Sequence, residues 1–173
     1  MNPQTPVEEL IAMLCDADWR VVMAAAVALG DRKEAKAALA LWALLQREDQ
    51  APIFTQTKDY SQEPAGSPFG ESGSLPADIP KETALAWERR GRLKQSAIFS
   101  LAAIGVADTA LLQRLQRYAV DQTQDYTVRA ASNRALGILK DTSARAALEK
   151  ATKDPEWCTM TEAKKALQKC SMS

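Results

Sequence analysis

Histidine is absent from the 173 residues, and this absence removes more chemistry than any other feature of the composition. Histidine is the commonest general base and the commonest neutral metal ligand in proteins. Ser-His-Asp and Cys-His nucleophile systems, HExxH zinc sites and C2H2 zinc fingers are therefore excluded. The three cysteines form no CxxC pair, which predicts a reducing compartment rather than a disulfide framework. We expect no cofactor and no metal, and the lack of a catalytic constellation favours a non-enzymatic protein.

Net charge and long apolar runs are lacking as well. The 22 basic and 22 acidic side chains cancel, so no overall field draws the chain to nucleic acid or to an anionic membrane. The longest apolar runs, Val21–Leu29 and Ala37–Leu45, have nine residues each, whereas a membrane span needs about 20. The N-terminus, MNPQTPVEEL, carries acids where a signal peptide carries Lys or Arg. We expect a soluble, cytoplasmic protein.

Glycine and proline are few, seven and eight, and they are concentrated in one stretch. Five of the prolines and three of the glycines lie between residues 52 and 80. Each proline removes a hydrogen-bond donor and disfavours helix in the residue before it, so no helix of useful length fits there. We expect a single domain over residues 1–173, with a flexible Pro/Gly-rich insertion at 50–80.

Helix-forming residues dominate the remainder of the chain. Alanine, the strongest helix former, occurs 31 times, and runs of β-branched residues are few. The pattern predicts an all-α fold with helices at about 6–15, 18–29, 33–48, 82–104, 108–120, 125–139, 142–152 and 156–169.

A short motif recurs in three of these helices: an acid, then an aromatic residue, then Ala-Leu nine and ten residues after the aromatic. Its copies begin at Asp18-Trp19, Asp125-Tyr126 and Glu156-Trp157. A weaker copy, near Gly91-Arg92, lacks the aromatic. Recurrence of this kind is typical of solenoids, in which each unit buries its apolar face only against its neighbours.

The repeat predicts a row of helix hairpins. The acid caps the first helix of each unit, and Gly30 and Gly137 are expected to end that helix in the left-handed conformation. A second helix then follows. In this interpretation residues 7–15 are the second helix of an incomplete first unit, and residues 157–169 are the first helix of an incomplete last unit. We expect the aromatic of the motif, Trp157 included, to be buried between units.

The segments DADWRVVMAAAVALGD and DYTVRAASNRALGILKD resemble the short bacterial HEAT-like repeats of the phycobilisome-lyase type. The usual form of that repeat is Asp-x-Asp-x-x-Val-Arg-x-Ala-Ala-x-x-Ala-Leu-Gly. Val128-Arg129 and Leu93-Lys94 fill its Val-Arg positions, whereas Val21-Val22 and Thr159-Met160 depart from them. The resemblance covers nearly all of the chain except 50–80. It implies a single HEAT-like repeat domain, an α-α superhelix of antiparallel hairpins, and says little of function because HEAT arrays have many unrelated roles.

Trp42 is the first candidate for contact with a partner. It lies in AALALWALL, a stretch that is apolar on nearly every side. Such a helix is normally buried all round, but a second helix of a solenoid leaves one face in solvent. Two interpretations stay open: ordinary burial, or a surface covered by the insertion or by a partner. In the second, Phe54 and Phe69 of the insertion are the groups that reach Trp42.

Arginines in two places are further candidates. A basic run stands at the start of the predicted helix 82–104, and its alternative interpretation is a solvated helix start neutralised by Glu82, Glu88 and the acidic insertion. Other arginines lie on the second helices, whose polar faces line the concave surface in the resembling family. The full set is Arg89, Arg90, Arg92, Arg114, Arg117 and Arg145.

Two classes of function follow, with a third kept beside them. The first is a non-enzymatic interaction scaffold or assembly factor that binds one protein partner on the solenoid surface. The alternative, implied only by the resemblance, is a phycobilin lyase or lyase-like subunit, whose partner is a bilin-carrying protein. A helical-repeat protein that binds nucleic acid is disfavoured by the zero net charge.

Overall fold

The computed structural model describes residues 4–50 and 80–171, and these residues fold into helices joined by short turns. The helices in chain order are α1 (Val7–Met13), α2 (Trp19–Asp31), α3 (Ala38–Gln50), α4 (Lys81–Ile104), α5 (Thr109–Val120), α6 (Tyr126–Ile138), α7 (Arg145–Ala151) and α8 (Trp157–Ser171). Short 3-10 turns, Ala35–Ala37 and Thr142–Ala144, precede α3 and α7. The all-α prediction is confirmed. The insertion predicted at 50–80 falls almost wholly outside the described residues.

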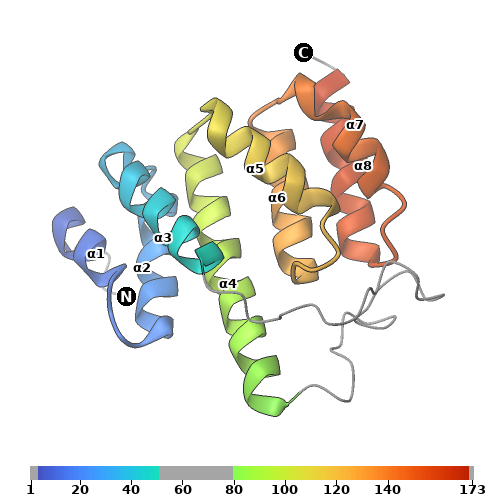
Figure 1. Cartoon of the computed structure of the whole chain (residues 1–173). Coiled ribbons are helices and arrows are strands. Elements are labelled where there is room, and N and C mark those ends of the chain that lie inside the picture. The colour runs from blue at the N-terminus through green and yellow to red at the C-terminus, as the bar shows by residue number, and fades with distance from the viewer. Residues whose placement is uncertain (1–3, 51–79, 172–173) are drawn as a thin grey trace.

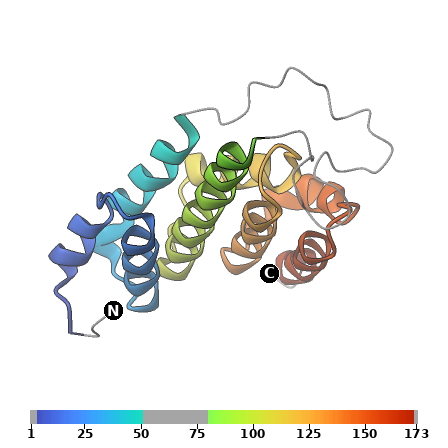
Figure 2. The ribbon, with the colours of Figure 1, turned by 90° about the horizontal axis from the view of Figure 1, so that it is seen from below.

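The helices form two layers (Figure 1). One layer is the row α2, α4, α6 and α8, in which each helix packs on the next. The other layer holds α1, α3, α5 and α7, and each of these packs on the helix that follows it in the chain. Seen from below, the units follow a curved row (Figure 2). This is the predicted α-α superhelix, in which two-helix units stack on their neighbours.

The predicted hairpin boundaries are wrong by one helix. The closely packed pairs are α1 with α2, α3 with α4, α5 with α6, and α7 with α8. The described residues therefore hold complete pairs at both ends, rather than two incomplete units. The motif lies on α2, α6 and α8, which are the second helices of their pairs, and it holds no information on which neighbour a helix contacts.

Acidic caps begin helices where the motif predicts them. Asp18 Oδ1 accepts a hydrogen bond from the amide of Arg20 at 2.9 Å. Asp125 Oδ1 accepts one from the amide of Thr127 at 2.7 Å. Each carboxylate satisfies an amide that has no partner within the first turn, and its charge complements the helix dipole.

Gly30 and Gly137 serve close packing rather than helix ending. Both lie inside their helices, so the predicted left-handed conformation at these positions is wrong. The described residues with positive φ are Lys33, Lys140 and Gly105. A Cβ on Gly30 would lie 2.7 Å from the Cα of Ser100, and one on Gly137 would lie 2.8 Å from the Cα of Ala166. The missing side chains let α2 approach α4, and α6 approach α8.

The core follows the Ala-Leu part of the motif, not the aromatic. Leu29 and Leu136 are fully buried. Trp19 is partly buried against the core, but Trp157 is 72% exposed. The prediction that Trp157 is buried is therefore wrong. It stands at the start of α8, and no further helix of the described residues lies beyond α8 to cover it.

Candidate functional site

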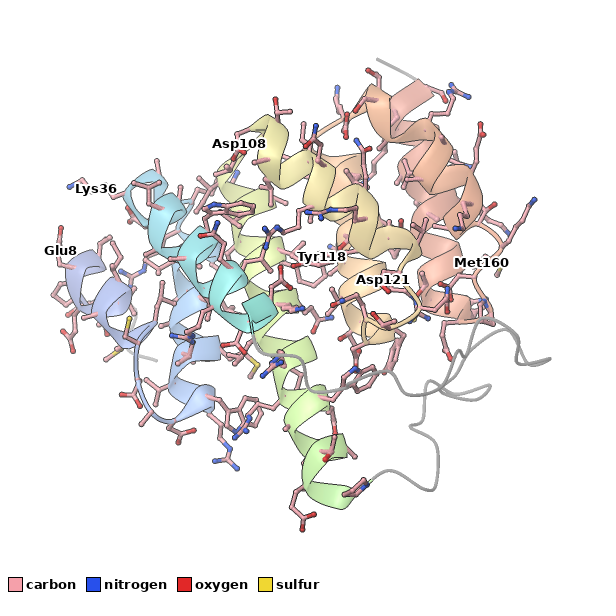
Figure 3. All side chains as sticks on the ribbon, viewed as in Figure 1. Glu8, Lys36, Asp108, Tyr118, Asp121 and Met160 are labelled. Atoms are coloured by element: carbon pink, nitrogen blue, oxygen red, sulfur yellow. The ribbon has the colours of Figure 1, made fainter. Side chains whose placement is uncertain are left out.

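The layer of α3, α5 and α7 is open between its α3 and α5 members. Helix α5 packs on α7, whereas α3 packs on α4, and its backbone is not closely packed on that of α5. A hollow of about 310 Å³ lies between them, and we call it the α3–α5 groove. Figure 3 shows Tyr118 and Asp121 at the C-terminal end of α5, beside the end of α3. The residues that line the groove are Gln46, Asp49, Arg114, Arg117, Tyr118 and Asp121.

Asp49 joins three helices at the wall of this groove. Its Oδ1 lies 2.6 Å from Nζ of Lys94 on α4. Its Oδ2 accepts hydrogen bonds from Nη1 of Arg114 and from the hydroxyl of Tyr118, both on α5. The Lys94 ammonium also donates to Oε1 of Gln124 at 3.0 Å. Because the Lys94 side chain is only 7% exposed, its charge needs these partners.

Two cations of the same network lie over the faces of aromatic rings. The Arg114 guanidinium lies 4.9 Å from the ring centroid of Trp42, and the Lys94 ammonium lies 5.1 Å from that of Tyr118. A cation over an aromatic face is attracted by the electron density of the ring. Trp42 is therefore half-buried beneath Arg114, and it forms part of the support of the groove rather than a bare apolar surface.

The Tyr118 hydroxyl stays protonated throughout the physiological range. Burial raises the pKa of Tyr118 far above its ordinary value, and the hydrogen bond to Asp49 raises it further. A phenol held in this way is a hydrogen-bond donor, not a base. The chemistry of the wall is thus that of a fixed ion-pair network.

The repeat explains why Lys94 turns to Asp49. At the corresponding position of the next copy, Arg129 pairs with Asp154, the first acid of the copy that follows it. Asp154 stands three residues before Trp157, and the position three residues before Tyr126, the aromatic of the copy that follows Lys94, holds Thr123. With no carboxylate at 123, the Lys94 ammonium takes its charge partner from α3 instead.

Arg117 is the exposed cation of the groove. It also lines a second, more open hollow of about 570 Å³ on the same face, together with Gln113, Gln116 and Val120 of α5. Gln116 is already engaged, because its amide donates to Asp141 Oδ2 at 2.8 Å. Within residues 4–50 and 80–171, Arg117 has no ion pair, so its guanidinium is available to a ligand.

The other predicted arginines are placed differently. Arg90 lies 3.6 Å from Glu48 of α3, and Arg92 pairs with Glu88 at 2.7 Å, an interaction that raises the Arg92 pKa. Arg89 is exposed on α4, and Arg145 lies 3.7 Å from Glu149 on α7. Glu88 thus neutralises part of the basic run as predicted.

The structure brings together only part of the predicted set. Arg114 and Arg117 line the groove and Trp42 lies beneath Arg114, whereas Arg89, Arg90, Arg92 and Arg145 do not line it. Phe54 and Phe69 lie outside the described residues. Sequence reasoning missed Asp49, Lys94, Gln46, Tyr118 and Asp121. A basic residue at the Arg position, combined with Thr at the matching acid position, is the signal that could have found the Lys94 network.

Sites of other kinds were also sought among the described residues. No group of three or more His, Cys, Asp or Glu side chains in that part of the chain could hold a metal ion. No helix there is long and apolar enough to cross a membrane. The cysteines lie apart, with Cys15 exposed, Cys158 half-buried and Cys170 buried. Burial raises the pKa of Cys158 and of Cys170, which disfavours the reactive thiolate.

Comparison with known proteins agrees with the repeat. Residues 1–54 match the family model described as HEAT repeats. No curated protein gave a significant match to the chain. HEAT repeats are helical repeats that commonly mediate protein interactions. With the family match over α1–α3 and the same two-layer packing through α8, the resemblance of this chain to HEAT-like repeat proteins is confirmed.

Proposed function

We propose that this protein is a non-enzymatic interaction module that holds a segment of one protein partner in the α3–α5 groove. The exposed, unpaired guanidinium of Arg117 carries the proposal. The neighbouring cations Lys94 and Arg114 both pair with Asp49, so Arg117 is the cation of the groove lining that forms no ion pair among the described residues. A carboxylate of the partner is its natural ligand, since guanidinium pairs with carboxylate through two parallel hydrogen bonds.

The rest of the lining suits an extended segment. Gln46 of the groove and Gln113 of the second hollow are exposed amides, and Arg117 lines both hollows. An amide side chain both donates and accepts, so it can bond to the peptide groups of an extended backbone. The fixed network behind them keeps the groove in one shape, which lowers the entropy cost of binding. The phycobilin-lyase alternative has the resemblance of the repeat as its only support.

A displayed library of random peptides tests the proposal. We expect selection on the immobilised chain to enrich peptides that carry Asp or Glu in an extended context. Their binding should fall about tenfold or more in Arg117→Glu, because like charges then meet across the contact. Lys36→Glu makes the same charge change at an exposed site on the far side of α3 and should bind as wild type does. Selected peptides without acids, or equal loss in both variants, would refute the proposal.

A further inference from the structure

The two ends of the helix row present opposite charges. Helices α1 and α8 lie at opposite ends of the molecule (Figure 1). The first is the outermost helix of the N-terminal pair, and the second belongs to the C-terminal pair. Both outer surfaces are free of other elements within the described residues. The charged side chains on each surface determine what kind of partner surface can bind there.

Acids gather on the N-terminal end. Within residues 4–19 there is no Lys or Arg. Four exposed carboxylates lie on α1 and on the turn that follows it, and a further one, Asp31, ends α2. Exposed cations also belong to this end: Arg20 lies 3.7 Å from Asp18, and Figure 3 shows Lys36 at the same end of the molecule as Glu8. The four carboxylates are Glu8, Glu9, Asp16 and Asp18.

Cations gather on the C-terminal end. Asp154 and Glu156 are buried there and offer no charge at the surface. The other two acids of this end, Glu149 and Glu162, are already paired with Arg145 and Lys165. A clear excess of positive charge remains. The exposed cations of α7, α8 and the turn between them that form no ion pair among the described residues are Lys150, Lys153 and Lys164.

Trp157 stands on the same basic end. Helix α8 turns Thr159, Ala163, Ala166 and Cys170 to α6, and these side chains are buried. At the helical spacing of 3.6 residues, Trp157, Thr161, Lys164 and Gln168 form the opposite stripe. An indole that is 72% exposed on such a stripe is a large apolar group left in water.

The earlier copies of the motif show what covers this position inside the array. Tyr126 occupies the position of Trp157, and the following unit lies against it. The carbonyl of Tyr126 accepts a hydrogen bond from Thr159 Oγ1 of α8 at 3.3 Å, and burial raises the pKa of the Tyr126 phenol. In the array, the cover of this aromatic position is therefore another helix pair of the same kind.

We propose that the cover of the basic end is a second copy of this chain, docked head to tail. The acidic surface of α1 and the following turn in one copy faces the α8 stripe that carries Trp157 and Lys164 in the next, and Trp157 is buried between them. Such a contact is heterologous: the two surfaces differ, so each copy keeps one free acidic end and one free basic end. Copies then add one after another in a row. This contact is separate from the α3–α5 groove and does not depend on its role.

Charge contributes much of the attraction, so the association responds to salt. The interaction between exposed charges decays over about 8 Å at physiological ionic strength, and it extends over much longer distances in dilute buffer. We expect sedimentation velocity to show larger species as the concentration rises to about 1 mM, a range that reveals Kd values of that order. High salt should shift the chain toward the monomer. A reducing agent is needed throughout, because Cys15 is exposed beside the acidic surface.

Charge reversal at each end identifies the two surfaces. Lys164→Glu on the basic end and Glu9→Lys on the acidic end should each raise the dissociation constant about tenfold or more, since like charges then face each other. Trp157→Ala should weaken association at constant charge. Arg89→Glu makes the same charge change as Lys164→Glu at an exposed site on α4, away from both ends of the row, and this matched control should associate as wild type does. Circular dichroism should show that all variants keep the fold.

Mixing the two reversed variants gives the decisive readout. The lysine at position 9 of one variant then meets the glutamate at position 164 of the other, so an equimolar mixture should associate again although neither variant does so alone. A chain that stays monomeric at every concentration in dilute buffer would overturn the proposal. So would association that both reversals leave unchanged, because the contact would then lie elsewhere.

Discussion

The guanidinium of Arg129 and the carboxylate of Asp154 form a two-point ion pair between consecutive units, out of reach of solvent. The Nε atom lies 2.9 Å from Oδ2 and Nη2 lies 3.1 Å from Oδ1. Each side chain is only 1% exposed. The same carboxylate accepts from the amide of Glu156, at the start of α8, at 2.9 Å. One acid therefore fixes the start of α8 and holds it to α6.

Removing one partner of this pair should be costly. Arg129→Met leaves Asp154 buried without its counter-charge, and we expect the free energy of unfolding to fall by about 3–5 kcal/mol. Urea denaturation measures it. Adding Asp154→Asn removes the stranded charge, so the double variant should lose less than the sum of the single losses. Strict additivity would contradict the ion pair as the source of the effect.

Truncation of the buried Trp87 and of the exposed Trp157 should lower the free energy of unfolding by very different amounts. Trp87 is 8% exposed, and its indole donates to the carbonyl of Thr123 at 3.3 Å. Trp87→Ala should cost about 3–5 kcal/mol, as other large core truncations do. Trp157→Ala should cost less than about 1 kcal/mol in dilute solution, because its ring is largely in water already. Equal shifts of the urea midpoint would show that Trp157 is covered within one molecule.

Alanine at Gly137 or Gly30 should destabilise the fold although alanine is the better helix former. The new methyl group would meet backbone of the facing helix at 2.8 Å or less. Overpacking of this kind costs about 1–3 kcal/mol. Ala43→Gly, on the exposed side of α3, calibrates the opposite effect, a loss of helix propensity of about 1 kcal/mol. A gain in thermal stability for either glycine variant would show that α2 and α6 can shift without cost.

Asp125 should make stability depend on pH in the direction opposite to a paired acid. Burial raises its pKa above the ordinary value, although hydrogen bonds from Thr127 oppose the shift. The folded state thus holds the proton more tightly than the unfolded state does. This contribution favours folding below the unfolded pKa and is lost as the pH rises through the folded pKa.

The variant Asp125→Asn tests the contribution of this carboxyl to stability, because the asparagine side-chain oxygen still caps α6 but carries no charge. We expect Asp125→Asn to be at least as stable as wild type at neutral pH. Its advantage should shrink below about pH 4, where an ordinary aspartate is protonated. Thermal melts across that range measure the difference. An advantage that grows toward acid would mean that the folded pKa lies below the unfolded one.

The sequence predicts the helices well because their signals are local. Alanine content, acidic caps and the Ala-Leu repeat each act within one or two turns, and every predicted helix is present within a few residues of its expected bounds. Which helices pair is a tertiary property, and there the prediction failed by one helix. Trp157 failed for a related reason: a repeat position predicts burial only where a further unit follows.

The groove was predicted in part, for a physical reason that Lys94 illustrates. Arg114 and Arg117 lie on the polar side of an amphipathic helix, so sequence alone identified them. Asp49 and Lys94 are 45 residues apart in the chain, and no local pattern joins them. Their meeting depends on α3 packing on α4, and only the missing acid at position 123 hints at it.

Helix α4 has 24 residues, and its length determines the distance between the end of α3 and the start of α4. Asp49 touches Lys94, and Pro80 stands 14 residues before Lys94, which is about 21 Å along a helix. A chain of the length of residues 50–80 can span at most about 100 Å, which is nearly five times this distance. Deleting 57–78 leaves about 30 Å of extended chain, still enough to reach. We expect this shortened protein to keep its helical circular dichroism and its urea midpoint, because a much shorter segment is long enough to join α3 to α4.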